Sequence, residues 1–301
     1  MKKVFLVYFI AVAFSSFVFI SESSSYNQPT LNPGVSNFLD GFVPGPGFYV
    51  VSHLHYYTAD ELRDSNGDEI PGSPDLAVMS EITQLVYLTD YKLLGGKVGF
   101  ESILPFSNVD IDGVGEESGF GDLFVAPFLQ FETKLFDTIP YHHRFLFGVV
   151  LPTGRYDCYR PVNIGHNHYT FTGYYAFTAF LTPKMATSWR FQYFHHTENK
   201  DFLSTRVDLK PGPLFQASYA FSYEILQGLR TGISGYYYKQ LSEDELNGNK
   251  ISGSKEQIFS IGPGIFYGKG NVCLWLNAQW EFEAECRSQG KSLFGKIMFK
   301  F

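Results

Sequence analysis

The chain has 301 residues, a formal net charge of −7, and equal shares of charged and aromatic residues, 18% each. Soluble domains carry about 25% charged residues, so this composition, with 31 Phe and 20 Tyr, argues against a disordered chain and a solvated helical protein. The acidic balance also argues against nucleic acid as a partner. We interpret the length as one domain, because barrels often exceed about 200 residues as a single unit.

The N-terminus has the pattern of a secretory signal peptide. Lys2 and Lys3 precede the apolar run from Val4 to Ile20, and small polar residues follow as far as Ser25. We therefore predict cleavage near Ser25, with residues 1–25 removed. The alternative is an uncleaved membrane anchor.

The rest of the chain is punctuated like a series of β-strands. Aromatic and β-branched segments of about ten residues alternate with clusters of Gly, Pro, Asn, Asp and Ser. The predicted strands span 48–58, 76–88, 96–106, 121–132, 142–151, 169–181, 186–196, 213–225, 229–241, 256–267, 271–284 and 291–301.

The connections between these segments alternate in length. Long connections at 59–75, 107–120, 152–168, 197–212 and 242–255 alternate with short ones such as 182–185, 226–228 and 268–270; the brief connection at 285–290 is the exception. Outer-membrane barrels sort their loops in this way. The sequence therefore predicts an all-β fold, a transmembrane antiparallel up-and-down β-barrel of about 12 strands over residues 48–301. Residues 26–47 would form an N-terminal periplasmic or plug segment.

Apolar residues alternate with polar ones along several strands, as expected when one face meets lipid and the other a lumen. In the strand at 271–284, Ala278, Trp280, Phe282 and Ala284 share the outer face, which turns the neighbouring carboxylates inward. The alternative is that the inward charges pair with one another and plug the barrel. The predicted pore-lining residues are Glu101, Arg190, Gln192, Glu224, Arg230, Gln279, Glu281, Glu283 and Lys296.

The last segment ends in an aromatic residue at the C-terminus. Phe299 and Phe301 share a face with Leu293 and Ile297, opposite Lys296. A terminal Phe on an alternating strand is typical of the signal that the barrel-assembly machinery recognises. We predict that Phe299 and Phe301 form this assembly signal.

Several short motifs stand at the ends of the predicted strands or within them. They are Pro46-Gly47, Leu104-Pro105, Gly119-Phe120-Gly121-Asp122, Leu151-Pro152-Thr153-Gly154, the run from Gly235 to Gln240, and Ile261-Gly262-Pro263. In this order and spacing they resemble the outer-membrane transporter family named for the meta-pathway of phenol degradation. The resemblance runs from about Gly47 to Phe301, and it implies a transport barrel for small, often aromatic or apolar compounds.

Catalytic and metal sites have weaker sequence support. His53, His55, His195 and His196 are candidate bases for a barrel lipase, but none stands in a nucleophile motif. His166 and His168 offer two imidazoles without a third ligand, and Asp64, Asn66 and Asp68 depart from a calcium loop. We therefore expect no catalytic residue, no metal and no cofactor.

The three cysteines allow at most one disulfide. Cys273 and Cys286 lie too far apart on one predicted strand to meet, which leaves Cys158 and Cys286 as the possible pair. The sequence does not decide whether that bond forms.

The preferred hypothesis is a channel or transporter for small, possibly aromatic or apolar solutes. It would lie in the outer membrane of a Gram-negative-type cell, among outer-membrane lipid and lipopolysaccharide. The first alternative is a structural or host-contact barrel without transport, and the second is an outer-membrane enzyme.

Overall fold

The computed structural model describes residues 37–301, and its regular secondary structure consists of strands. The predicted signal peptide lies outside the described residues. Within the part that is described, no helix is long and apolar enough to cross a membrane.

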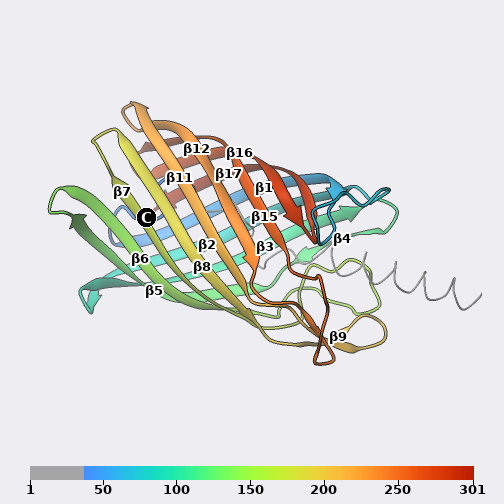
Figure 1. Cartoon of the computed structure of the whole chain (residues 1–301). Coiled ribbons are helices and arrows are strands. Elements are labelled where there is room, and N and C mark those ends of the chain that lie inside the picture. Colours follow the sequence, from blue (N-terminus) through green and yellow to red (C-terminus); the bar gives the residue numbers. More distant parts are fainter. Residues whose placement is uncertain (1–36) are drawn as a thin grey trace, which may run out of the picture.

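Twelve long antiparallel strands form one closed sheet (Figure 1). Closure is made by β1, which pairs with β2 on one side and with β17 on the other, so that Tyr49 lies opposite Lys300. The predicted barrel is confirmed, and each predicted segment falls on one strand. The strands are β1 (Gly47–Leu62), β2 (Leu76–Leu93), β3 (Gly96–Ile111), β5 (Leu123–Leu135), β6 (Ile139–Leu151), β7 (Thr170–Phe180), β8 (Met185–His196), β11 (Leu214–Leu226), β12 (Leu229–Gln240), β15 (Gln257–Lys269), β16 (Val272–Glu285) and β17 (Ser288–Lys300).

The two ends of the barrel differ as the connection lengths predict. Tight turns and the C-terminus lie at one end, and the long connections gather at the other (Figure 1). At the long-loop end, β4 (Gly115–Phe120) pairs with an extension of β3. A separate small sheet there joins β9 (Asn199–Phe202), β10 (Val207–Lys210), β13 (Glu245–Leu246) and β14 (Asn249–Lys250).

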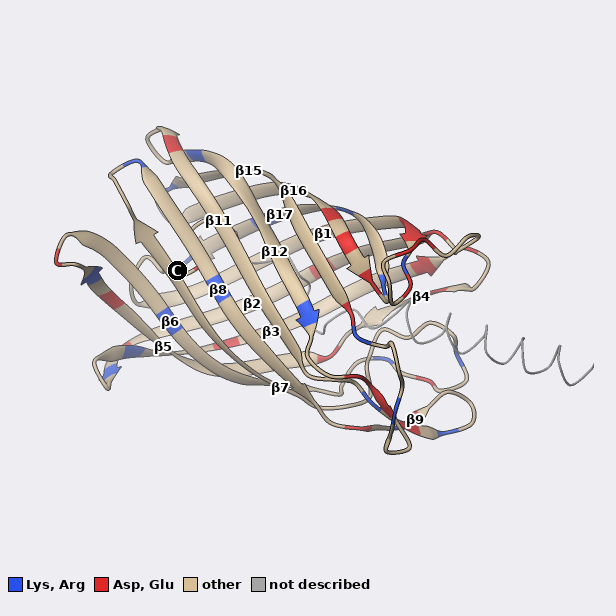
Figure 2. Cartoon of the chain, in the orientation of Figure 1, with Lys and Arg blue, Asp and Glu red and all other residues tan. Residues whose placement is uncertain are grey.

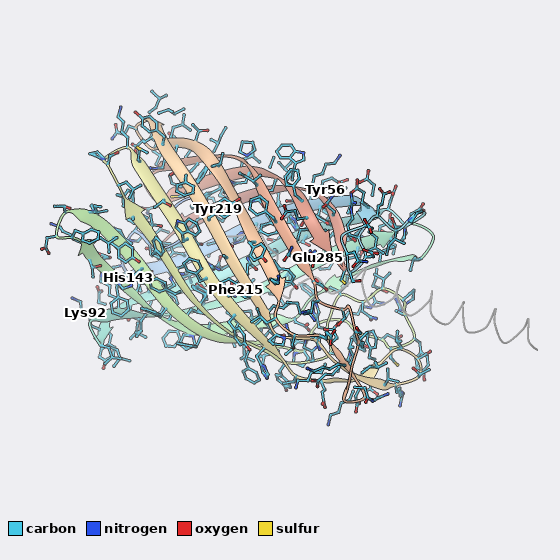
Figure 3. All side chains as sticks on the ribbon, viewed as in Figure 1. Tyr56, Lys92, His143, Phe215, Tyr219 and Glu285 are labelled. Carbon is cyan, nitrogen blue, oxygen red and sulfur yellow. The ribbon has the colours of Figure 1, made fainter. Side chains whose placement is uncertain are left out.

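The outer wall of the barrel is apolar. Side chains such as those of Phe215 and Tyr219 stand out from the wall (Figure 3), and Leu54 and Leu276 are more than half exposed. Charged residues gather in the loops at one end and near the turns, whereas most of the strand surface carries none (Figure 2). A closed sheet with an apolar outer band satisfies its backbone hydrogen bonds internally, as a membrane-spanning structure must.

The inner wall is polar and largely shielded from solvent. Ser234, Asn277 and Thr178 are fully buried, on three different strands. Along β11 the burial alternates residue by residue, with Gln216 and Ser218 inside and Phe221 and Tyr223 outside. The expected alternation of an outer apolar face and an inner polar face is confirmed for this strand.

Candidate solute path in the barrel lumen

Residues 37–45 lie inside the barrel, where they bond to strands all around the wall. The Asn37 side chain donates to Asn277 Oδ1 of β16 at 3.1 Å, and the Leu39 amide donates to Ser188 Oγ of β8 at 3.0 Å. The Gly41 amide donates to Thr178 Oγ1 of β7 at 3.0 Å. We call residues 37–45 the lumen segment, because only a position in the lumen reaches these strands together.

An ion pair anchors the middle of the lumen segment. Arg190 of β8 donates from Nε and Nη2 to the two carboxylate oxygens of Asp40, each at 2.9 Å. The Arg190 guanidinium also lies 4.1 Å from the centre of the Tyr174 ring of β7. Such a two-pronged arrangement fixes a carboxylate in both position and orientation.

A second charged pair lies on nearby strands, on the far side of β7 from Arg190. Arg144 of β6 lies 3.5 Å from Glu101 of β3, and both side chains are almost completely buried. Gln130 of β5 joins this pair to the lumen segment, because it accepts from Arg144 Nε at 3.0 Å and donates to the Gly41 carbonyl at 2.9 Å. The pairing shows that Glu101 is not a free carboxylate along the path.

Lys296 of β17 has a different environment. Its Nζ lies 4.0 Å from the centre of the Trp275 ring, and within residues 37–301 no carboxylate oxygen lies within 4.0 Å of it. Lys296 interacts electrostatically with Asp40 and Arg190. The middle of the lumen therefore holds three cationic side chains, Arg144, Arg190 and Lys296, against the carboxylates of Asp40 and Glu101.

The other residues predicted to line the pore bond to neighbouring strands of the wall. Arg230 and Glu224 form an ion pair of 2.8 Å beside the β11–β12 turn. Gln192 donates to Thr172 Oγ1 at 3.0 Å, and Gln279 lies 3.4 Å from Ser234 Oγ; both glutamines are buried. These side chains occupy the inner face, each held by a neighbour on the wall.

Glu281 and Glu283 have opposite environments near the loop end of β16. Glu281 is buried, accepting from Tyr57 at 2.8 Å and from Tyr236 at 2.5 Å. Glu283 is exposed, with a φ of 54°, where the β15–β16 register shifts. This irregularity turns Ala284 inward, where it is buried against Tyr236. The expected inward position of Glu283 and outward position of Ala284 are therefore wrong.

Residues 59–297 match the family described as "Putative MetA-pathway of phenol degradation". The chain belongs to this family. In fold it is similar to the COG4313 outer membrane channel from Pseudomonas putida F1, at 18% identity and a TM-score of 0.79, over 90% of this chain and 100% of that one. The transport unit of the autotransporter AIDA-I from Escherichia coli gives 9% identity and a TM-score of 0.51, over 93% and 99% of the chains. No curated protein matches at a significant level.

In this family member, the outer wall has an apolar recess of about 700 Å³ over β1, β2, β3, β5, β6 and β7. The β5–β6 pairing skips from Val125 with Val149 to Phe128 with Leu146. Pro127 lies in this gap and cannot donate a backbone hydrogen bond to the neighbouring strand. The aromatic residues around the recess are Phe48, Tyr87, Phe100, Phe147 and Phe171.

At the long-loop end of the barrel, ion pairs and hydrogen bonds link the loops to one another. Glu117 of β4 pairs with Arg155 at 2.6 Å and with Arg160. Asp122 accepts from the His166 ring and the Gly154 amide, at 2.9 and 2.8 Å. These contacts tie the loop before β7 to the loop after β3.

Most of the histidines considered as bases or ligands have structural partners, and His195 is exposed on β8. His53 bonds to Gln84 at 3.0 Å, His55 stacks on Phe294 at 4.1 Å, and His196 bonds to Thr170 Oγ1 at 2.9 Å. His168 in the loop before β7 is buried, which lowers its pKa to about 4. In residues 37–301, no group of three or more His, Cys, Asp or Glu side chains is arranged to hold a metal.

The acidic turn and the cysteines show no special chemistry. Asp64 Oδ1 accepts from the amides of Asn66 and Asp68, at 2.8 and 3.0 Å, as in an ordinary Asx turn. Cys158 and Cys286 are both free, and the Cys286 thiol donates to the Gly253 carbonyl at 2.7 Å.

Sequence reasoning missed several residues of the lumen. Asp40 precedes the first strand and pairs with Arg190, 150 positions away, so no local pattern indicates it. Arg144 and Tyr174 had a usable signal, because each alternates with outward aromatic residues along its strand. Gln130 alternates with the outer residues Leu129 and Phe131 in the same way.

Proposed function

We propose that the protein is an outer-membrane channel for small solutes. The observation that carries the proposal is that a separate stretch of chain, the lumen segment, occupies the middle of the lumen. The segment pairs with no strand, and its anchors are side-chain hydrogen bonds and one ion pair. Its withdrawal would vacate the middle of the lumen in a barrel of intermediate strand number.

The groups around the lumen segment favour solutes that combine an apolar body with a polar group. Phe266 and Trp275 of the wall pack against the segment. The Tyr174 ring stacks on the Arg190 guanidinium, which in turn binds Asp40. The apolar recess on the outer wall offers a second place where an aromatic compound would partition from lipid. The similarity in fold to the outer membrane channel from Pseudomonas putida F1 supports this proposal.

The proposal places the mature chain among outer-membrane lipid and lipopolysaccharide, after cleavage of the signal peptide. The barrel-assembly machinery would recognise the C-terminal strand, where Phe299 and Phe301 are exposed on the outer wall. The pore-lining role proposed for the inward residues now excludes Glu283.

Solute influx into vesicles tests this function. The mature chain, residues 26–301, would be reconstituted in vesicles with lipopolysaccharide in the outer leaflet, which slows passive diffusion of apolar compounds. We expect 3-phenylpropanamide to pass faster than into protein-free vesicles. A structural or host-contact barrel predicts no added influx, even when the lumen segment has been displaced by mutation, and that result would overturn the proposal.

A further inference from the structure

The lumen segment presents an aromatic ring and a carboxylate two residues apart. Phe38 is only 1% exposed and packs in a cluster with Ala186, Ala220, Phe266 and Trp275. Its neighbour Asp40 is held by both nitrogens of the Arg190 fork. The segment therefore fills an apolar pocket and a carboxylate site at the same time.

The carboxylate site belongs to the barrel wall and is built around Arg190. A guanidinium that donates two parallel hydrogen bonds matches the geometry of any carboxylate, whether on a side chain or on a solute. The Tyr174 ring lies 4.1 Å from the guanidinium and holds its plane. Lys296, which has no ion-pair partner among the described residues, adds a second positive charge nearby.

The charge balance of the lumen favours an anion when the lumen segment leaves. With Asp40 in place, two carboxylates face Arg144, Arg190 and Lys296; without it, only Glu101 remains, and that residue is paired with Arg144. A buried guanidinium that loses its partner is strongly destabilised. A solute that brings its own carboxylate removes this cost, whereas a neutral solute does not.

We propose that the lumen binds aromatic monocarboxylates at the place now filled by Phe38 and Asp40. The solute carboxylate takes the Arg190 fork, and its ring takes the pocket beside Trp275, so that binding and displacement of the lumen segment are one exchange. This inference rests on the proposed channel function and names its substrate class. The exchange is non-covalent, and it makes Asp40 a competitor of the solute.

Binding to the detergent-solubilised mature chain tests the site independently of transport. We expect 3-phenylpropanoate to bind, measured by calorimetry, and 3-phenylpropanamide to bind at least about tenfold more weakly. Asp40→Asn should tighten 3-phenylpropanoate binding by about tenfold, because the competing carboxylate is gone. Arg190→Gln should abolish the preference for the acid over the amide.

The matched control is Arg206→Gln, which removes a guanidinium that is exposed in an outer loop, 3.9 Å from Asp201. It should bind both probes like the unmodified chain. Equal binding of acid and amide, or an acid preference that survives Arg190→Gln, would overturn the inference.

Influx of the same two probes separates this inference from the proposed function. Influx of both probes without preference for the acid would leave the channel standing and reject the carboxylate site. Selective acid binding without influx of either probe would support the site and reject the channel. Failure of both measurements would reject both.

Discussion

Gly41→Ala should open the barrel by pushing the lumen segment off the wall. A Cβ at position 41 would lie 2.4 Å from the carbonyl carbon of Phe177 and 2.5 Å from both Phe177 Cα and Thr178 N. All three are backbone atoms of β7, which neighbouring strands hold in place on both sides. Carbon atoms pack at about 3.5–4.0 Å, so the segment must retreat by about 1 Å or more.

The retreat weakens the bonds that hold the segment. Overpacking costs about 1–3 kcal/mol, and the two hydrogen bonds of Gly41, to Thr178 and Gln130, are stretched in addition. A change of about 1–3 kcal/mol shifts the ratio of open to closed lumen by about 5–150-fold. Single-channel recording in planar bilayers measures this ratio as the open probability.

The matched control is Gly295→Ala in β17, where an added Cβ meets nothing within 4 Å. It should record like the unmodified chain, and both variants should keep the heat-dependent gel shift of a folded barrel. If Gly41→Ala gave the same open probability as Gly295→Ala, the lumen segment would not be what closes the path.

Three further predictions concern assembly, membrane orientation and the loops. Deleting Phe301 should lower the amount of assembled barrel in the outer membrane without blocking secretion across the inner membrane; unchanged amounts on a heat-modifiability gel would refute its signal role. Leu276→Lys on the outer wall should destabilise the barrel by about 2–4 kcal/mol if it lies near the bilayer midplane, whereas Glu283→Lys should be tolerated. Equal unfolding midpoints in urea would contradict that orientation. Burial lowers the pKa of His168 from 6.5 to about 4, so between these values the unfolded loop binds a proton that the folded loop does not. Loop stability should fall by up to about 3 kcal/mol as the pH drops through this window. Limited proteolysis of residues 152–169 should therefore be faster at pH 4.5 than at pH 7, and His168→Gln should reduce the difference; equal rates in the unmodified chain would refute it.

The strands and most of their orientation could be predicted from the sequence. Along each strand, the alternation of apolar and polar residues indicates which side chains face outward. Phe221 and Tyr223 face outward and Ser222 inward because lipid and lumen impose opposite polarities on neighbouring positions. This local rule fails at an irregularity, as at Glu283, where a left-handed residue shifts the alternation. It also fails where the wall carries a polar outer residue such as Glu81, which accepts a hydrogen bond from Ser52 at 3.0 Å.

The contents of the lumen could not be predicted because they depend on contacts between distant residues. Asp40 meets Arg190, and Asn37 meets Asn277, only after the barrel has closed around them. A pattern of alternating residues shows that Arg190 points inward, but it carries no information about its partner. The sequence therefore indicated charged groups in the lumen and offered residues 26–47 as a periplasmic or plug segment, but it gave neither the partners of those charges nor the contacts of that segment.

Cross-linking the lumen segment to the wall tests the central claim most directly. The chain would carry Asn37→Cys and Asn277→Cys, whose parent side chains touch at 3.1 Å, with Cys158, Cys273 and Cys286 replaced by Ser. Influx of 3-phenylpropanamide into vesicles is then measured in one sample before and after reduction of a thiol-cleavable cross-link. We predict influx at the protein-free level while the cross-link is intact and influx at the level of the uncross-linked chain after reduction. Equal influx in the two states, above the protein-free level, would show that the solute path does not require the lumen segment to move.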